Sequence, residues 1–178
     1  MSKKLYIGLI LMLMSILKRF FIFSVIIPLC FLFGCGTYVK KGVTTNGEKV
    51  YLGVTPIEKT PAYENFLRSS KSEVDKLYYL LDRIRDSRSL IYIYEGDQYN
   101  WFEAYSTGVW VLWHHYRKGE DARSALRREV ANYSGDEAVY IKFQNESIHL
   151  AYRILLNELD LLDETYKRNL SSTAASKK

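Results

Sequence analysis

Cysteine is almost absent from this chain of 178 residues, whose two cysteines, Cys30 and Cys35, both lie near its start. Because no cysteine follows Cys35, the rest of the chain contains no disulfide bond within itself. That remainder is still long enough to fold, since a domain near 150 residues buries roughly 68 to 70% of its unfolded surface. We therefore expect an apolar core, rich in tyrosine and tryptophan, to hold the fold together.

A large excess of charge of one sign is also missing beyond the first residues. The whole chain has a formal net charge of +5, but Lys3, Lys4, Lys18 and Arg19 lie in a stretch without acidic residues. From Cys35 onward, 21 basic and 20 acidic side chains remain, which leaves a net charge of +1. Nucleic acid requires a clustered positive surface, so we expect no nucleic-acid partner.

One long uncharged run, residues 20–33, follows Lys18-Arg19 and is closed by Gly34-Cys35. A basic segment, an apolar segment of about 14 residues and a small residue before the cleavage point are typical of a secretory signal. Because a cysteine follows the small residue, the segment resembles a bacterial lipoprotein signal in which Cys35 is acylated. Gly36 after this cysteine favours the periplasmic face of the outer membrane if the organism is Gram-negative.

Two other interpretations of the N-terminal segment are open. In the first, residues 5–33 form one uncleaved membrane anchor, although Lys18 and Arg19 would each cost roughly 2.5 to 3.5 kcal/mol near its centre. In the second, translation starts at Met12 or Met14 rather than at the first methionine, which gives a conventional short basic segment.

The sequence predicts four regions. Residues 1–34 form the signal, and residues 35–69 form the acylated cysteine and a tether, with a hairpin at Asn46-Gly47. Residues 70–170 form the globular domain, and residues 171–178 form a small, polar, disordered tail.

Within the globular region, helix starts and strand runs alternate. Helices are expected after Ser70 or Ser72, after Asn100, after Asp121 and after Asn145, because each of these residues can cap a helix. Strands are expected over 90–94 and 139–143, which are rich in β-branched and aromatic residues. This order predicts an α+β fold, with a small antiparallel sheet packed against about four helices.

The helix after Asn100 is apolar nearly all round, because Trp101, Trp110 and Trp113 add to its regular apolar stripe. Such a helix is usually buried. We therefore expect it to be central in the fold, with Gly108 in its middle costing about 1 kcal/mol relative to alanine.

Three short segments carry a resemblance to a known family: residues 80–87, residues 94–99 and Glu103-Ala104. Together they resemble the YfeK-like family of small exported bacterial proteins, over roughly residues 73–143. The resemblance implies export and implies no known reaction.

Residues that could support metal binding are few. His114 and His115 are adjacent, so on a helix they point about 100° apart, whereas helical zinc ligands need a spacing of three or four. His149 could join them only through a tertiary contact. We expect no metal site and no cofactor.

Catalysis has one candidate group of acids. Glu95, Asp97 and Glu103 could serve as paired carboxylates, as in glycan cleavage. Glu95 and Asp97 more simply belong to a turn, and Glu103 to a helix cap. A cell-wall-acting glycan hydrolase that uses Glu103 with Glu95 or Asp97 is thus the alternative function, and no catalytic residue is assigned.

Aromatic residues are the best candidates for binding, since exposed rings can stack on sugars or anchor a protein partner. The candidate residues are Tyr94, Tyr99, Trp101, Trp110 and Trp113, together with Tyr92. We expect a lipid-anchored envelope protein that acts as a non-catalytic binding or assembly module. Its expected partners are the membrane, through acyl chains on Cys35, and an envelope protein or glycan.

Overall fold

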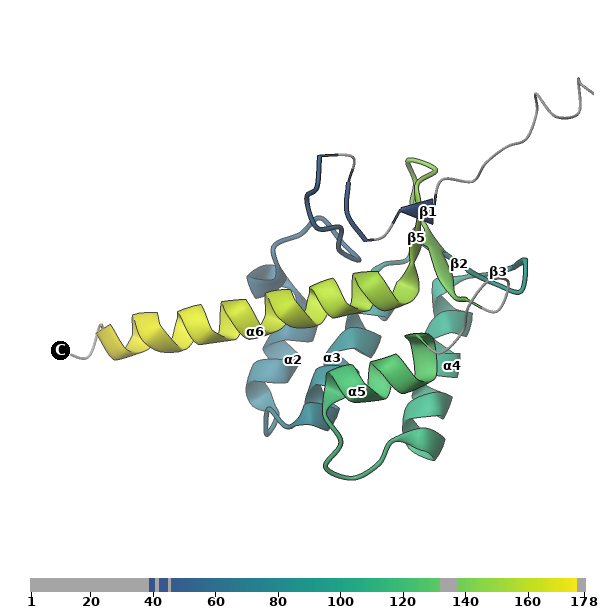
Figure 1. Ribbon diagram of the computed structural model, residues 1–178. Coiled ribbons are helices and arrows are strands. Elements are labelled where there is room, and N and C mark those ends of the chain that lie inside the picture. Colours follow the sequence, from purple (N-terminus) through teal and green to yellow (C-terminus); the bar gives the residue numbers. More distant parts are fainter. Residues whose placement is uncertain (1–38, 41, 45, 132–137, 176–178) are drawn as a thin grey trace, which may run out of the picture. The chain divides into compact units, whose positions relative to one another are not determined.

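The computed structural model describes residues 39–40, 42–44, 46–131 and 138–175 (Figure 1). The expected signal segment, Cys35 and the start of the expected tether lie outside these residues. In the described part, five α-helices and five strands form an α+β domain, which confirms the predicted fold class. No helix in this part is long and apolar enough to cross a membrane.

The sheet combines four antiparallel strands with one short parallel strand at its edge. Its strand order is β1-β5-β4-β2-β3, and only β1 runs parallel to its neighbour. Its members are β1 (Val39–Lys40), β2 (Ile91–Tyr94), β3 (Asp97–Tyr99), β4 (Tyr140–Lys142) and β5 (Ile148–Leu150). The strands β2 and β4 confirm the two predicted strands, and Tyr92 pairs with Ile141 between them.

A tight turn joins β2 to β3. Glu95 and Gly96 have φ angles of 52° and 86°, and positive φ at both central residues is the geometry of a type I′ hairpin turn. The sequence predicts the turn here but not the short strand that follows it.

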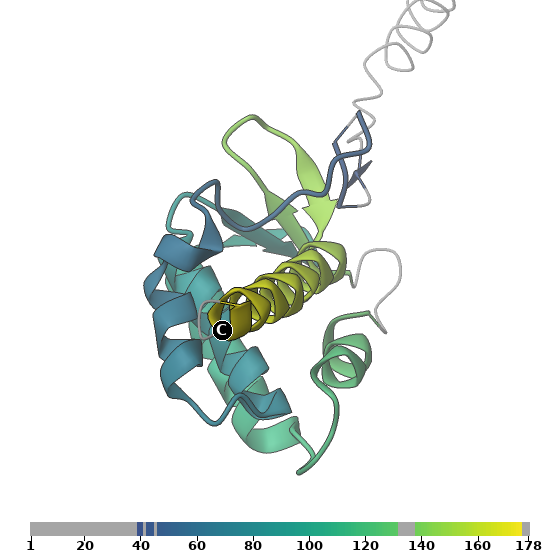
Figure 2. The ribbon, with the colours of Figure 1, turned by 90° about the vertical axis from the view of Figure 1, so that its left-hand side faces the viewer.

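The last helix of the domain is also the longest, and the other helices lie around it. The helices are α2 (Pro61–Arg68), α3 (Glu73–Asp86), α4 (Trp101–His115), α5 (Ala122–Leu126) and α6 (Ala151–Ala175). Two shorter turns are η1 (Ile57–Lys59) and the π-helical turn η2 (Arg127–Ala131). Figure 2 looks almost along α6, with α2 and α3 on one side of it and α5 on the other.

Capping chemistry explains where two of the helices begin. Before α3, the backbone N–H of Ser72 donates to the Asp75 carboxylate at 2.9 Å, and the Ser72 hydroxyl accepts from the Asp75 N–H. Before α4, Asn100 and Glu103 exchange the same pair of bonds. These capping boxes satisfy backbone groups that have no partner within the helix, and they confirm the predicted helix starts.

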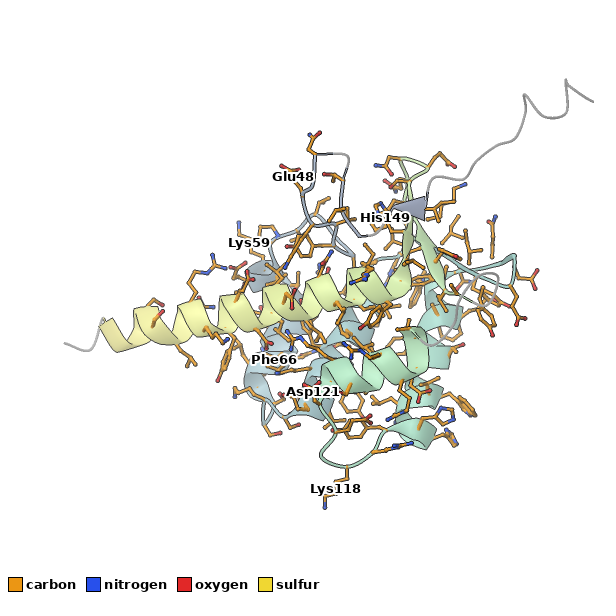
Figure 3. The ribbon with its side chains drawn as sticks, viewed as in Figure 1. Glu48, Lys59, Phe66, Lys118, Asp121 and His149 are labelled. Atoms are coloured by element: carbon orange, nitrogen blue, oxygen red, sulfur yellow. The ribbon has the colours of Figure 1, made fainter. Side chains whose placement is uncertain are left out.

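The core lies along α6. Ile154, Leu159 and Leu162 are fully buried there. Phe66 of α2 meets Tyr166 of α6 edge to face, with ring centroids 5.8 Å apart (Figure 3). Near the end of the described helix, the Asn169 amide donates to the Tyr63 hydroxyl at 2.8 Å. Most of α6 therefore packs within its own domain.

The segment before α3 is also docked on this core. The side-chain amide of Asn157 donates to the backbone oxygens of Gly42 and Val50, at 2.8 and 2.9 Å. Leu52 and Ile57 are buried. Thus the described part of the range expected to be a tether contributes to the core, and it includes the predicted turn at Asn46-Gly47, where only Gly47 has a positive φ.

Helix α2 lies in the same range, where the sequence shows no sustained helical period. It begins because the Thr60 hydroxyl accepts from the Tyr63 N–H and proline occupies the first helical position, which suits a residue without an N–H. Its apolar face is short, with Ala62, Tyr63 and Phe66 buried. Three buried residues over two helical turns are too few to show a sustained helical period in the sequence.

The last predicted helix start is wrong. Asn145 caps no helix; its side-chain oxygen accepts from the Ser147 N–H and hydroxyl in a turn. Ile148 begins β5, which pairs with β4, and α6 starts only at Ala151. At the other end, α6 continues to Ala175, so the predicted disordered tail is helical over residues 171–175.

Candidate functional site

Helix α4 lies at the edge of the fold and not at its centre. None of its residues is fully buried, so the prediction of a buried central helix is wrong. The helix rests on α3 at Gly108, where an added Cβ would lie 2.5 Å from a methyl carbon of Leu81. Glycine permits this close approach, which offsets its low helix propensity.

An apolar cavity of about 470 Å³ lies between α3, α4, α5, η2, the sheet and α6. Its size falls within the range of about 300 to 1,000 Å³ that is usual for small-molecule sites. Its wall is formed mainly by aliphatic side chains, among them Leu77, Leu80, Leu81 and Ile84 of α3, Val111 and Leu112 of α4, and Leu155 of α6. This wall suits an apolar ligand.

The charged residues in the described part of the wall are Glu103, Arg128 and Glu129. Arg128 donates through its Nε to Glu129 at 2.7 Å, through one Nη to the backbone oxygen of His115 at 2.9 Å, and through the other to Glu120. All three nitrogens of the guanidinium thus already have protein acceptors. The Glu103 carboxylate is held by the N–H of Asn100 at 2.8 Å.

These contacts shift the pKa values at the cavity. Burial would raise the pKa of Glu129, but hydrogen bonds from His115 and Arg128 outweigh burial and lower it. Hydrogen bonds to Glu120 and Glu129 raise the pKa of Arg128. The hydrogen bonds from Arg128 also lower the pKa of Glu120, so Glu120 and Glu129 are ionised at neutral pH, and Arg128 is positively charged.

The five aromatic residues predicted to bind a partner do not form one cluster. Tyr94 and Tyr99 line the cavity. Trp101 lies beside the Arg88 guanidinium, whose central carbon is 5.2 Å from the ring centroid. Trp110 and Trp113 lie on the outer surface of α4. The structure thus divides the predicted site into a cavity wall and an exposed face.

The exposed face consists of Phe102, Trp110 and Trp113, whose exposed fractions are 60%, 54% and 75%. Trp110 stacks on His114, with ring centroids 4.7 Å apart. Because α4 lies at the edge of the fold, one side of the helix contacts the body and the other side contacts solvent, so its apolar residues are not all buried.

The acids proposed for catalysis serve local structure. Glu103 forms the capping box of α4. Glu95 stands in the β2–β3 turn with a positive φ, and Asp97 begins β3. These are the turn and cap roles that the sequence offers as the simpler explanation.

The three histidines occupy separate places. His114 Nδ1 lies 2.8 Å from the backbone oxygen of Trp110, and His115 Nδ1 lies 2.8 Å from Glu129. His149 is buried in β5 (Figure 3), with its Nε2 3.3 Å from the Ser147 hydroxyl. Over the described ranges, no three potential metal ligands gather at one point.

Sequence reasoning named Glu103, Tyr94 and Tyr99 but missed the cavity that they line and its two other described charged residues. Arg128 and Glu129 belong to the charged segment after Asp121, which looks like an ordinary solvated helix face. The turn η2 departs from the regular α-helix at these residues, and such π-turns often mark functional sites. The one signal available was the all-round apolar pattern of α4, which indicated an unusual helix but not a cavity beside it.

No protein-family model matches the chain, and neither a curated protein nor a solved structure matches it. The resemblance to the YfeK-like family stays a prediction.

Proposed function

We propose that this protein is a lipid-anchored envelope protein whose globular domain is a non-catalytic binding module for an apolar ligand. The observation that carries the proposal is the cavity of about 470 Å³ beside α4. The cavity is partly open to solvent, so a ligand can enter it. Its size and its mainly aliphatic wall are typical of small-molecule binding sites.

The local roles of the acids favour binding over glycan hydrolysis. A hydrolase needs one carboxyl to donate a proton and a second carboxylate on the opposite side of the bond. Glu103 accepts from the Asn100 N–H, and Glu95 stands in an exposed turn. Most of the described side chains in the wall are also apolar, which suits an apolar ligand better than a sugar.

A dye titration tests the binding site. Nile red is uncharged and fluoresces more strongly in apolar surroundings, so it should bind to the purified domain with one site per chain. Thr107 and its neighbour Ser106 are both exposed to solvent, but only Thr107 lines the cavity. We expect Thr107→Phe to weaken dye binding at least about tenfold, which corresponds to about 1.4 kcal/mol.

Ser106→Phe is the matched control, because it adds the same ring one residue away. It should leave dye binding unchanged. If the dye instead occupied the exposed aromatic face, Ser106→Phe would change its affinity and Thr107→Phe would not. That result, or no binding to the unchanged protein, would contradict a ligand site in the cavity.

The lipid anchor needs a separate test, namely the intact mass of the protein extracted from membranes. A product that begins at Cys35 and carries acyl chains, and that is lost in Cys35→Ser, is the expected result. More than one acyl chain is needed for stable anchoring. An unprocessed chain in the membrane would instead favour an anchor over residues 5–33.

A further inference from the structure

The charges around the cavity limit which polar head group an apolar ligand bound there can carry. This inference rests on the proposed function. The charged residues of the wall, together with those paired to them, are Glu103, Glu120, Glu129, Arg128 and His115. Among these described residues, three carboxylates face two cations even with His115 protonated. This described cluster beside the cavity therefore carries a net negative charge.

Arg128 is the one residue in the described part of the wall that could attract an anion. Its charge is already balanced by Glu120 and Glu129, and its third nitrogen donates to a backbone oxygen. A ligand carboxylate or phosphate would have to displace one of these acceptors and lie near the others. Like charges at such short range repel one another, and they do so more strongly near a protein surface than in water.

We propose that the cavity binds a single-chain amphiphile whose head group carries no negative charge, such as a monoacylglycerol. The apolar chain would lie against the aliphatic side chains of α3, α4 and α6. The hydroxyl groups of an uncharged head can donate to the carboxylates of Glu103 and Glu129 and accept from the tyrosines of the wall. Charge complementarity thus selects against a fatty acid of the same chain length.

Two ligands with the same twelve-carbon chain test this inference, namely monododecanoylglycerol and dodecanoate. Each is titrated below its aggregation concentration, at mildly alkaline pH, where dodecanoate is ionised. Binding is followed by isothermal titration calorimetry, since no tryptophan is among the described residues that line the cavity. We expect dodecanoate to bind at least about tenfold more weakly than the glycerol ester.

A matched pair of variants assigns the discrimination to the cavity. Glu103→Gln removes one negative charge from the wall and should narrow the ratio of the two affinities about threefold. Glu95→Gln makes the same change in the exposed β2–β3 turn, outside the wall, and should leave the ratio unchanged. An equal effect of the two variants would contradict a local charge effect.

The outcomes separate this inference from the proposed function. Equal or tighter binding of dodecanoate would overturn the inference and indicate that Arg128 accepts an anion, while a cavity that binds apolar ligands would stand. Failure of both dodecyl ligands to bind, with Nile red bound, would also overturn the inference. Failure of Nile red as well would remove the proposed function itself.

Discussion

Arg83 of α3 and Glu158 of α6 form an ion pair in the core, with the arginine Nε 3.0 Å from a carboxylate oxygen and side-chain exposures of 3% and 0%. The same carboxylate accepts from the Leu52 N–H at 2.6 Å and from the Tyr79 hydroxyl at 3.2 Å. One side chain of α6 therefore joins α3 and the docked N-terminal segment.

Removal of this carboxylate should be strongly destabilising. Glu158→Ala leaves the Arg83 charge buried without a partner, and breaking a buried pair in this way costs about 3 to 5 kcal/mol. The double variant Arg83→Met with Glu158→Leu removes both charges and should recover only part of that loss, because the Leu52 N–H and the Tyr79 hydroxyl still lose their acceptor. Urea unfolding of the three proteins measures both effects. A loss below about 1 kcal/mol in Glu158→Ala would contradict a dry ion pair.

Two buried tyrosines should respond in opposite ways to loss of the hydroxyl. Burial and the nearby Glu158 raise the pKa of Tyr79 and of Tyr92, so both phenols stay protonated. Tyr79 donates to Glu158, whereas the Tyr92 hydroxyl has no hydrogen-bond partner among the described residues. Tyr79→Phe should cost about 1.5 to 3 kcal/mol, and Tyr92→Phe should be neutral or stabilising by up to about 1 kcal/mol.

Each of these substitutions is the other's control, since both remove one oxygen from a buried ring. Thermal and urea unfolding give the comparison. An equal loss in the two variants would mean that the Tyr92 hydroxyl has a partner, such as a bound water.

Local chemistry explains which parts of the fold are predictable from the sequence. The starts of α3 and α4 are encoded within four residues each, by Ser72 with Asp75 and by Asn100 with Glu103. The β2–β3 turn is likewise encoded by adjacent residues. These elements need no distant partner to be favoured, so the sequence pattern alone identifies them.

The elements that were missed depend on contacts between distant residues. Ile148 to Leu150 fit a helical period, but pairing with β4 makes them a strand. The position of α4 depends on the close approach of α3 to Gly108. The cavity depends on how the elements around it pack against one another. An amphipathic period reports that a face is apolar, but not whether a neighbouring element covers it.

The exposed face of α4 tests whether an apolar helix face is covered by a neighbouring element. Trp113 is largely exposed, so Trp113→Gln should change the free energy of unfolding by less than about 0.5 kcal/mol. Leu81→Ala, on the covered side of the α3–α4 contact, should cost about 2 to 5 kcal/mol. Urea unfolding followed by circular dichroism compares them. A loss above about 2 kcal/mol in Trp113→Gln would instead support the sequence-based prediction of a buried helix.

Asp160 should make the docked N-terminal segment sensitive to acid. Its carboxylate lies 3.0 Å from Lys49 and 3.0 Å from Arg123. Burial would raise the pKa of Asp160, but the hydrogen bonds from these two cations outweigh burial and lower it. Because the folded state binds the proton less tightly than the unfolded state, the stabilisation is present above the unfolded pKa of about 3.9 and is lost as pH falls through the lower folded value.

Asp160→Asn should therefore be less stable than the unchanged protein at neutral pH, and the difference should shrink below about pH 4. Urea unfolding at several pH values measures this convergence. Other carboxylates with lowered pKa values, such as Asp75 and Asp121, contribute to the acid sensitivity of both proteins and cancel in the comparison. Glu48→Gln, at the exposed tip of the same segment (Figure 3), should follow the unchanged protein at every pH. A constant difference between Asp160→Asn and the unchanged protein across this range would mean that Asp160 acts through its shape and not through its charge.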